Sequence, residues 1–381
     1  MMYVRRRTRL ATALVAAGAA ATLAFTLYAG GSPNASAASA RSSSATPTVI
    51  GSVIQSLQNP WDANNVKFQK AVAAALGINL KVVPDQLTDE SNEAATQNLI
   101  AAGVKGLVID PFSQASGLAD AHYAEQDKVP FVDQDREFEP NIYNYKGKEL
   151  IAQSTDAAQT SGYEIMSSLI KEGATKIVLL FPPHGNSVVE SGFLGVEQAV
   201  KQHPGVSIVA QEWTTQTYNN AVSTMQELLL KYKPGQINGV FGIGGTMAQG
   251  ALYAINQAHR TSQFHVATWD DFGAIIKAIQ NGTMVETQGG AWLEGGFMLI
   301  ALYDYLHGHA PLNRQPLFTQ IDVTKSNAAA YNSEFLQTGD PLTAAQIRAL
   351  SLTYNPKANL PKFIENFHST WQQPNRGVPN S

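Results

Sequence analysis

The sequence predicts an α/β protein built from two doubly wound, parallel-sheet lobes. Short apolar runs alternate with helical patterns from residue 48 to about residue 280, which is typical of strands and helices in a covered parallel sheet. The alternation stops between residues 136 and 147 and then resumes with the same rhythm. The chain has 381 residues, of which 44% are hydrophobic, and this is enough for two cores.

The first series opens with a strand and a helix whose ends are well marked. Asn59 and Pro60 are typical of an N-cap and a first helical position, and Gly77 is typical of a helix end. Periodicity predicts the other elements. The expected strands are 49–54, 80–83, 106–109 and 129–132, and the expected helices are 59–77, 90–102 and 113–126.

The second series has the same form. Its expected helices are 157–171, 188–202, 219–232, 247–259 and 272–280, and its expected strands are 176–181, 206–210, 239–241 and 265–268. A helical pattern over 289–308 and an apolar run at 320–324 predict two further crossings between the lobes. We therefore expect a first lobe of 48–155 with 290–319, a second lobe of 156–289 with 320–372, and a disordered tail of 373–381.

The N-terminus has the pattern of a signal peptide, residues 1–40. Four Arg residues precede an uncharged, Ala-rich stretch at 10–29, and two Ala-Ser-Ala sequences predict cleavage after Ala37 or Ala40. An uncleaved membrane anchor is the alternative, because the apolar stretch approaches the length that spans a bilayer. Residues 41–47 then form a flexible tether. The mature chain is expected in the periplasm or outside the cell.

Composition excludes several classes of function. Charged residues make up 15% of the chain, below the usual share of about 25%, and basic runs are confined to the first nine residues. A nucleic-acid partner is therefore not expected. The sequence contains no cysteine, so it has no disulfide, thiolate metal site, Cys nucleophile or lipid-anchoring Cys.

A candidate binding site lies at the end of the fourth expected strand. The apolar run 129–132 is followed at once by polar residues that include Asp135 and Arg136. A buried parallel strand delivers such side chains into a crevice at its carboxyl end. Asp accepts hydrogen bonds from ligand hydroxyls or amines, and Arg donates a planar fork. A surface ion pair is the alternative interpretation.

Templates for catalysis and metal binding do not fit. The segment 185–189 lacks the closing Gly of a nucleophile elbow. The Gly-rich segment 242–245 has neither the spacing of a Walker loop nor that of a Rossmann fingerprint. His307 and His309 have no nearby Cys or acid as partner ligands. The alternating acids over 133–139 lack the Gly and Glu of a calcium loop. We expect no catalytic residue, no metal and no cofactor.

Four motifs in order resemble the ribose-type periplasmic sugar-binding proteins, the type I solute-binding proteins of ABC importers. The motifs are an apolar strand followed by Asn-Pro-Trp at 50–61, Gly-Leu-Val-Ile-Asp-Pro at 106–111, Val-Asp-Gln-Asp-Arg at 132–136 and Ala-Thr-Trp-Asp at 267–270. The resemblance runs from about residue 49 to about residue 324. It implies two Rossmann-like lobes joined by a three-segment hinge, with the ligand in the cleft between them.

The resemblance also implies which residues bind the ligand. Asn59, Trp61, Asp135 and Arg136 would contact it from the first lobe, and Asp270 from the second. The Trp61 ring would stack on the apolar face of a sugar, and the polar groups would reach its hydroxyls. The alternative for Trp61 is a hydrophobic staple at the helix start.

Several positions depart from the family pattern and imply a more acidic pocket. Asp62 stands where many members have a second aromatic residue, and Glu190 stands where an Arg is usual. Gly244 and Gly245 stand where the family has an Asn-Asp pair. The Gln that is usual in the family aligns with Gly290 or, with a small shift of the alignment, with Gln288. The usual aromatic residue aligns with Gln216, so Trp213 or Tyr218 would fill its space.

The expected function is an exported, monomeric receptor that hands a small polar ligand to an ABC permease. Presentation of the ligand to a sensor protein, and an α/β enzyme that uses the crevice acids, are the alternatives. A lac-repressor-type regulator would need a helix-turn-helix where the leader lies. The family favours a neutral sugar or polyol as ligand, whereas Glu190 favours a cationic or amino-bearing one.

Overall fold

The computed structural model describes residues 47–139, 141–213, 217–337 and 341–371. The chain divides into two units, Met1–Ala45 and Thr46–Ser381, and all of these residues belong to the second. The expected signal peptide, most of the tether and the tail 373–381 lie outside the described residues. Within the described ranges, no helix has the length and apolar character needed to cross a membrane.

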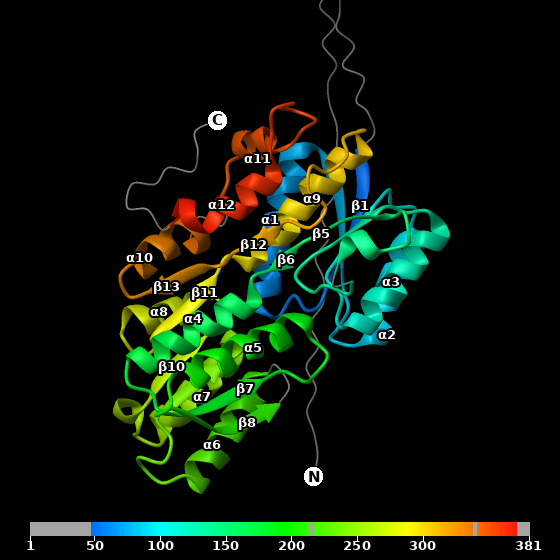
Figure 1. The fold of residues 1–381 in the computed structure, drawn as a ribbon. Coiled ribbons are helices and arrows are strands. Elements are labelled where there is room, and N and C mark those ends of the chain that lie inside the picture. Colours follow the sequence, from blue (N-terminus) through cyan, green and yellow to red (C-terminus); the bar gives the residue numbers. More distant parts are fainter. Residues whose placement is uncertain (1–46, 140, 214–216, 338–340, 372–381) are drawn as a thin grey trace, which may run out of the picture. The chain divides into compact units, whose positions relative to one another are not determined.

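The first lobe is a parallel sheet of five strands in the order β2-β1-β3-β4-β5 (Figure 1). Helices α1 and α9 cover one face, and α2 and α3 cover the other. The fifth strand was not predicted, because it follows the polar segment after β4 without an intervening helix. The bounds are β1 Thr48–Ile54, β2 Ile78–Pro84, β3 Leu107–Ile109, β4 Phe131–Asp133, β5 Leu150–Gln153, α1 Pro60–Leu76, α2 Asp89–Ala101, α3 Gln114–Asp127 and α9 Glu294–Leu306, with a 3-10 turn at Ile142–Asn144.

Local chemistry sets the ends of α1, which brings two expected site residues to the cleft. The backbone N–H of Trp61 donates to Oδ1 of Asn59 at 3.0 Å, so Asn59 caps the helix as predicted. Gly77 ends it with a φ of 74°, a left-handed conformation that glycine adopts without steric cost. Between these ends, Phe68 and Val72 are fully buried against the sheet and α9.

The second lobe repeats this plan with four parallel strands in the order β10-β9-β7-β8. Helices α4 and α5 pack together on one face of the sheet, and α6 and α7 pack together on the other (Figure 1). The bounds are β7 Lys176–Phe181, β8 Ser207–Trp213, β9 Gly239–Gly242, β10 His265–Thr268, α4 Ala158–Lys171, α5 Ser187–Gln202, α6 Tyr218–Lys231, α7 Gly245–Gln257 and α8 Gly273–Gln280, with a 3-10 turn at Thr261–Gln263.

Three segments of the chain cross between the lobes. The first contains β6 (Thr155–Asp156), the second runs from β11 (Glu286–Gly289) into the 3-10 turn Ala291–Leu293, and the third joins β12 (Leu317–Phe318) to β13 (Ile321–Thr324). β6 pairs with β12 in parallel, and β11 pairs with β13 antiparallel. The predicted class, two parallel-sheet α/β lobes with a three-segment connection, is confirmed.

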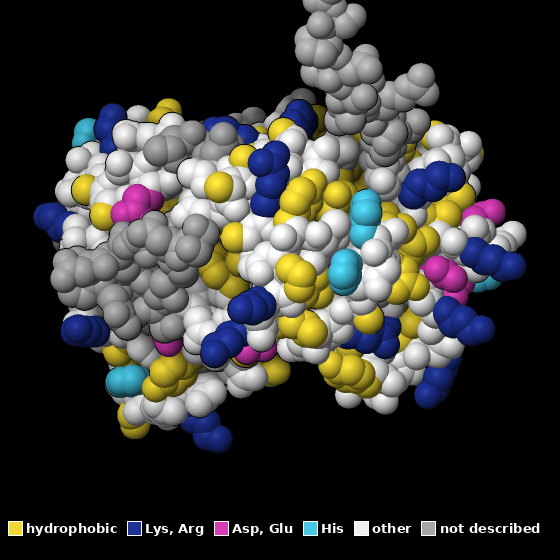
Figure 2. All heavy atoms as spheres, turned by 90° about the horizontal axis from the view of Figure 1, so that it is seen from above, with side chains coloured by type: hydrophobic (Ala, Val, Ile, Leu, Met, Phe, Trp, Pro, Cys, Tyr) yellow, Lys and Arg dark blue, Asp and Glu magenta, His cyan; other side chains and the backbone are white. Residues whose placement is uncertain are grey.

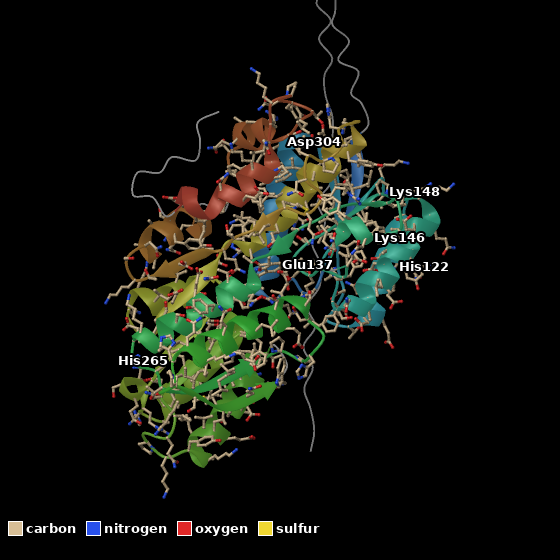
Figure 3. All side chains as sticks on the ribbon, viewed as in Figure 1. His122, Glu137, Lys146, Lys148, His265 and Asp304 are labelled. Atoms are coloured by element: carbon tan, nitrogen blue, oxygen red, sulfur yellow. The ribbon has the colours of Figure 1, made fainter. Side chains whose placement is uncertain are left out.

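The C-terminal segment does not stay with the second lobe as expected. The short helix α10 (Ala328–Tyr331) and the π-helical turn Asn332–Gln337 contact α8, but α11 (Ala344–Leu350) and α12 (Leu360–Trp371) pack against α1 and α9 of the first lobe. Asp304 on α9 (Figure 3) fixes this return, because its carboxylate accepts from Ser351 Oγ at 2.6 Å and from the backbone N–H of Leu352 at 2.7 Å.

Acidic side chains are unevenly distributed between surface and interior. Figure 2 shows one face on which Lys and Arg side chains are scattered among mostly uncharged atoms and few Asp or Glu are seen. Many acids are buried instead, although an ionised carboxylate is costly to remove from water. The buried acids are Asp62, Asp85, Asp110, Asp120, Asp133, Asp135, Asp156, Asp271, Glu286, Glu294 and Asp304.

Candidate ligand-binding site

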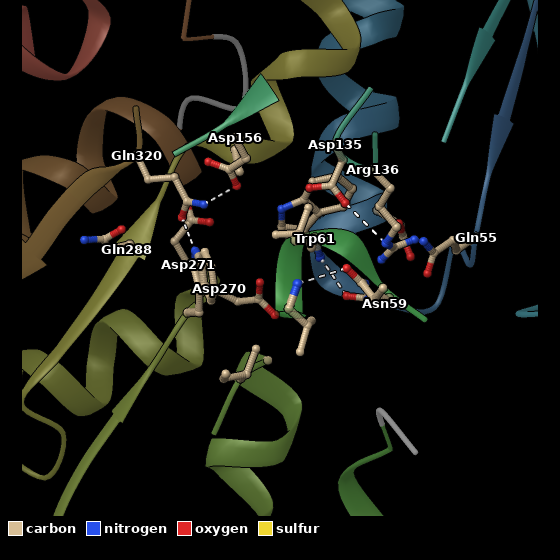
Figure 4. Close-up of a pocket in the computed structure, with 18 residues that line it drawn as sticks. Gln55, Asn59, Trp61, Asp135, Arg136, Asp156, Asp270, Asp271, Gln288 and Gln320 are labelled. Atoms are coloured by element: carbon tan, nitrogen blue, oxygen red, sulfur yellow. Dashed lines mark hydrogen bonds and ion pairs between the residues drawn. The ribbon is translucent and has the colours of Figure 1, made fainter. Parts of the chain in front are cut away.

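A pocket with about 640 Å³ of empty space lies between the two lobes (Figure 4). This space includes parts that are open to solvent. The first lobe contributes Gln55, Asn59, Trp61, Asp62, Asp135 and Arg136. The second lobe contributes Asn186, Val188, Val189, Ile243, Gly244, Trp269, Asp270 and Asp271. The crossing segments contribute Asp156, Gln288, Ala291 and Gln320.

Sheet topology explains why the pocket forms here. Gln55 follows β1, Asp135 follows β4, Ile243 follows β9 and Trp269 follows β10, so each comes from the carboxyl end of a parallel strand. In doubly wound sheets, the loops at these ends diverge where the strand order reverses and leave a crevice. The two crevices face each other, so the pocket receives polar side chains from both lobes.

The Asp135–Arg136 pair lies in the pocket as predicted. Asp135 has a φ of 65°, a left-handed conformation that is uncommon outside glycine and is found at functional sites. Nε of Arg136 lies 3.6 Å from Oδ2 of Asp135, and its Nη1 lies 3.4 Å from Oδ1 of Asp110. Burial opposes the charge, but these carboxylates raise the pKa of Arg136. The guanidinium is held as a fixed cation beside the cleft.

Asp62 supplies a second acid from the first lobe, at the start of α1. It is almost fully buried, and one carboxylate oxygen accepts from the backbone N–H of Ser56 at 3.1 Å. Burial raises its pKa well above the ordinary value, and the nearby charge of Arg136 opposes this rise. Asn59 and Trp61 are half-buried at the same helix end. This side of the pocket therefore combines an aromatic ring with hydrogen-bonding groups.

Asp270 and Gly244 meet on the side formed by the second lobe. The backbone N–H of Gly245, at the start of α7, donates to Oδ2 of Asp270 at 2.8 Å. Gly244 has a φ of 129°, and a Cβ there would lie 3.0 Å from Met247, so a side chain would be strained. Burial raises the pKa of Asp270 to about 7 and that of Asp271 to about 6.

A hydrogen-bonded chain joins the second lobe to two crossing segments. Nε1 of Trp269 donates to Oε1 of Gln320 at 2.6 Å, and Nε2 of Gln320 donates to Oδ2 of Asp156 at 2.6 Å. Figure 4 shows Gln320 between Asp156 and Asp271, whereas the amide of Gln288 points away from the other labelled side chains. Nε2 of Gln288 donates to Asp322 at 2.7 Å, so Gln288 fastens β11 to β13 at the pocket edge.

Two predicted residues do not line the pocket. Glu190 turns outward, where its carboxylate lies 2.9 Å from Nδ1 of His184 and its side chain is 43% exposed. Trp213 stacks on His184, with ring centroids 3.5 Å apart. The cause is the phase of α5: the helix begins at Ser187, so Val188 and Val189 face the pocket and the next residue turns away. Neither Glu190 nor Trp213 is therefore among the residues that line the pocket in this structure.

Sequence reasoning also missed residues that line the pocket. Gln55 had a usable signal, because it ends the first strand inside the quoted opening motif. Asn186 lies just before the expected helix at 188–202, and in the structure it is the N-cap of the corresponding helix, α5. Asp156 and Gln320 had no local signal, because they come from crossing segments whose juxtaposition depends on the whole fold. The other eight predicted residues line the pocket, and their role in binding stays a prediction.

The chemistry of the pocket is that of a polar receptor. Five Asp residues line it, and among its described lining residues Arg136 is the one basic side chain. A carboxylate accepts hydrogen bonds, and a carboxyl that keeps its proton also donates one. One group of acids beside it has the composition of a cation site: Asp135 and Asp156, which line the pocket, and the buried Glu294 each offer an oxygen, all within 4.8 Å of one another.

Two parallel-sheet lobes, a three-segment connection and a polar pocket between the lobes define a two-lobed solute-binding protein. The chain belongs to the periplasmic binding protein domain family, whose domain matches residues 50–307. The resemblance to the ribose-type members of this class is confirmed by relatives and solved structures.

Three comparisons illustrate this relationship. The chain is 27% identical over 240 residues to the ribose import binding protein of Salmonella typhimurium, covering 62% of this chain and 77% of that protein. It is 22% identical over 255 residues to the xylitol-binding protein of Mycolicibacterium smegmatis, covering 65% and 70%. The crystal structure of a galactofuranose binding protein superposes with a TM-score of 0.71 at 21% identity, covering 77% of this chain and all of that one.

Proposed function

We propose that this protein captures a neutral, polyhydroxylated ligand, a sugar or polyol, and delivers it to an ABC importer. The observation that carries the proposal is the combination of Trp61 with five Asp side chains in one pocket between the lobes. Sugars present apolar ring faces, which stack on aromatic rings, and hydroxyls, which bind in-plane carboxyl, amide and guanidinium groups. The names of the relatives, which bind ribose, xylitol and galactofuranose, support the same ligand class.

The charge of the pocket favours a neutral ligand over a cationic one. The argument for an amine rested on Glu190, and that residue lies outside the pocket. The acids that do line it have raised pKa values, chiefly because of burial, as for Asp62, Asp156 and Asp270. A raised pKa makes a carboxyl easier to protonate, and a protonated carboxyl carries no negative charge and can donate to ligand oxygens.

Export and the partner complete the proposal. The N-terminal pattern of residues 1–40 supports export, and the mature protein would begin at Ala38 or Arg41. N-terminal sequencing of secreted protein tests this, and an intact Met1 in the membrane fraction would contradict it. We further propose that the mature protein is a monomer that docks on a permease. Presentation of the ligand to a sensor protein remains the alternative.

A thermal-shift screen of sugars, polyols and amines on residues 41–381 tests the ligand class. A ligand at about 100 times its dissociation constant adds roughly 2.7 kcal/mol to the free energy of unfolding. The hit is then titrated at low and high salt, because attraction to a cation is screened and hydroxyl binding is not. A polyol as the best hit, with the same affinity at low and high salt, supports the proposal. An amine as the best hit, with affinity that falls steeply as salt rises, would overturn it.

A further inference from the structure

Three carboxylates from three different segments meet beside the pocket, and two of them, Asp135 and Asp156, line it. Asp135 follows strand β4, Asp156 ends β6 in the first crossing segment, and Glu294 begins α9 after the second. Each offers an oxygen, and these oxygens all lie within 4.8 Å of one another. Like charges this close repel one another, so the cluster needs an occupant or a proton to be stable.

The hydrogen bonds of this cluster leave buried oxygens without partners. Glu294 is 1% exposed; its Oε2 accepts from the backbone N–H of Asp135 at 3.3 Å and from the hydroxyl of Ser154, but its Oε1 has no hydrogen bond. Oδ2 of Asp156 accepts from Gln320, but its Oδ1 is also unpartnered. A buried acceptor without a partner is costly, and more so when it is charged. The two unpartnered oxygens, Oε1 of Glu294 and Oδ1 of Asp156, belong to two of the three carboxyl groups of the cluster.

The basic side chains of the protein do not neutralise this cluster. Nε of Arg136 lies 3.6 Å from Oδ2 of Asp135, but the same guanidinium also forms an ion pair with Asp110 through Nη1. Within the described ranges, no Lys, Arg or His forms an ion pair with Asp156 or Glu294. Two of the three acids therefore face one another without a protein cation.

We propose that Asp135, Asp156 and Glu294 bind one divalent hard cation, such as Ca²⁺ or Mg²⁺. Carboxylate oxygens are the ligands that these ions prefer, and the remaining coordination positions are taken by water. The ion would join the end of β4 to two of the crossing segments and so stiffen the connection between the lobes. The sequence predicted no metal, because the alternating acids at 133–139 do not form a loop site. Here Asp135 is combined instead with acids distant in the chain.

Protons are the competing occupant. Burial, with the neighbouring carboxylates, raises the pKa of both Asp156 and Glu294. The test is therefore made at pH 7.5 and constant ionic strength, without any sugar, so that it does not depend on the proposed ligand. Residues 41–381 are treated with EDTA and dialysed. Ca²⁺, Mg²⁺ and Mn²⁺ are then titrated separately by calorimetry, and thermal unfolding is recorded at 1 mM ion.

The expected result is one ion bound per chain and a melting temperature raised by several degrees. Glu294→Gln keeps the size of the side chain and removes its charge, so it should weaken ion binding at least tenfold. Glu190→Gln, whose site lies outside the pocket, should bind the ion as the unmodified protein does. If Glu294→Gln does not fold, Asp156→Asn takes its place.

Two results would overturn the proposal. One is that none of the three ions binds at millimolar concentration, which would leave the cluster to protons. The other is that an ion binds equally well to Glu294→Gln and Asp156→Asn, which would place it elsewhere. Equal loss of binding in Glu190→Gln would likewise show that the effect is not specific to the cluster.

Discussion

Nε2 of Gln320 donates to Oδ2 of Asp156 at 2.6 Å, so that the third crossing segment is bound directly to the first. The same amide accepts from Nε1 of Trp269 through its oxygen. Gln320→Ala would leave an indole N–H and a carboxylate oxygen buried without partners. We expect a loss of about 1–3 kcal/mol in the free energy of unfolding. Chemical denaturation measures it, and Gln159→Ala, at an exposed position on α4, is the control that should change little.

The Asp135 carboxylate should contribute directly to ligand affinity. Asp135→Ala is expected to weaken binding by about 1.5–3 kcal/mol, which is roughly 10- to 150-fold in dissociation constant, because a charged hydrogen bond is lost. Glu190→Ala should leave affinity unchanged, since that carboxylate faces His184 outside the pocket. Calorimetric titration with the ligand from the screen compares the two. Intact affinity in a folded Asp135→Ala protein would show that the ligand binds elsewhere.

Ligand binding should close the two lobes. Binding residues come from both sides of one pocket, and three segments connect the sides, which is the arrangement of hinge closure around a ligand. We expect the radius of gyration in solution scattering to fall when the ligand is added at saturation. A radius that stays the same at full occupancy would indicate a rigid site.

Stability should fall as pH rises, and Asp120 on α3 gives a direct test. This residue is fully buried, and burial raises its pKa to about 8. Between pH 4 and 8 the folded protein holds a proton that the unfolded chain has released, so stability decreases by at most about 1.4 kcal/mol per pH unit. Asp120→Asn should reduce this slope in denaturation at pH 5, 6, 7 and 8. Asp127→Asn, at the exposed end of the same helix, should keep it.

The C-terminal helices should depend on Asp304. Its carboxylate accepts from Ser351, Leu352 and Thr353, which lie between α11 and α12. Asp304→Ala would leave these donors unpaired, with an expected loss of about 2–4 kcal/mol. Limited proteolysis should then cut the segment around residue 352 sooner than in the unmodified chain. A cleavage rate no faster than that of Glu172→Ala, at an exposed position, would contradict this.

The sequence alone determined the features that depend on neighbouring residues. The helix ends at Asn59 and Gly77, the alternation of strands and helices, and the polar residues at the end of β4 all follow from capping, periodicity and the abrupt end of an apolar run. These signals lie within a few residues of the structure they specify. They were sufficient for the fold class and for the position of Asp135 and Arg136 at the end of β4.

Only the tertiary structure decided which distant residues meet. The phase of α5 in the packed lobe turns Glu190 toward His184, and two separate crossings bring Asp156 and Gln320 into the pocket. The return of α11 to the first lobe depends on contacts such as Arg348 Nε with the carbonyl of Ala75. The last two outcomes rest on pairings across more than 100 residues. Their energies arise only when the whole chain has packed, so no local pattern encodes them.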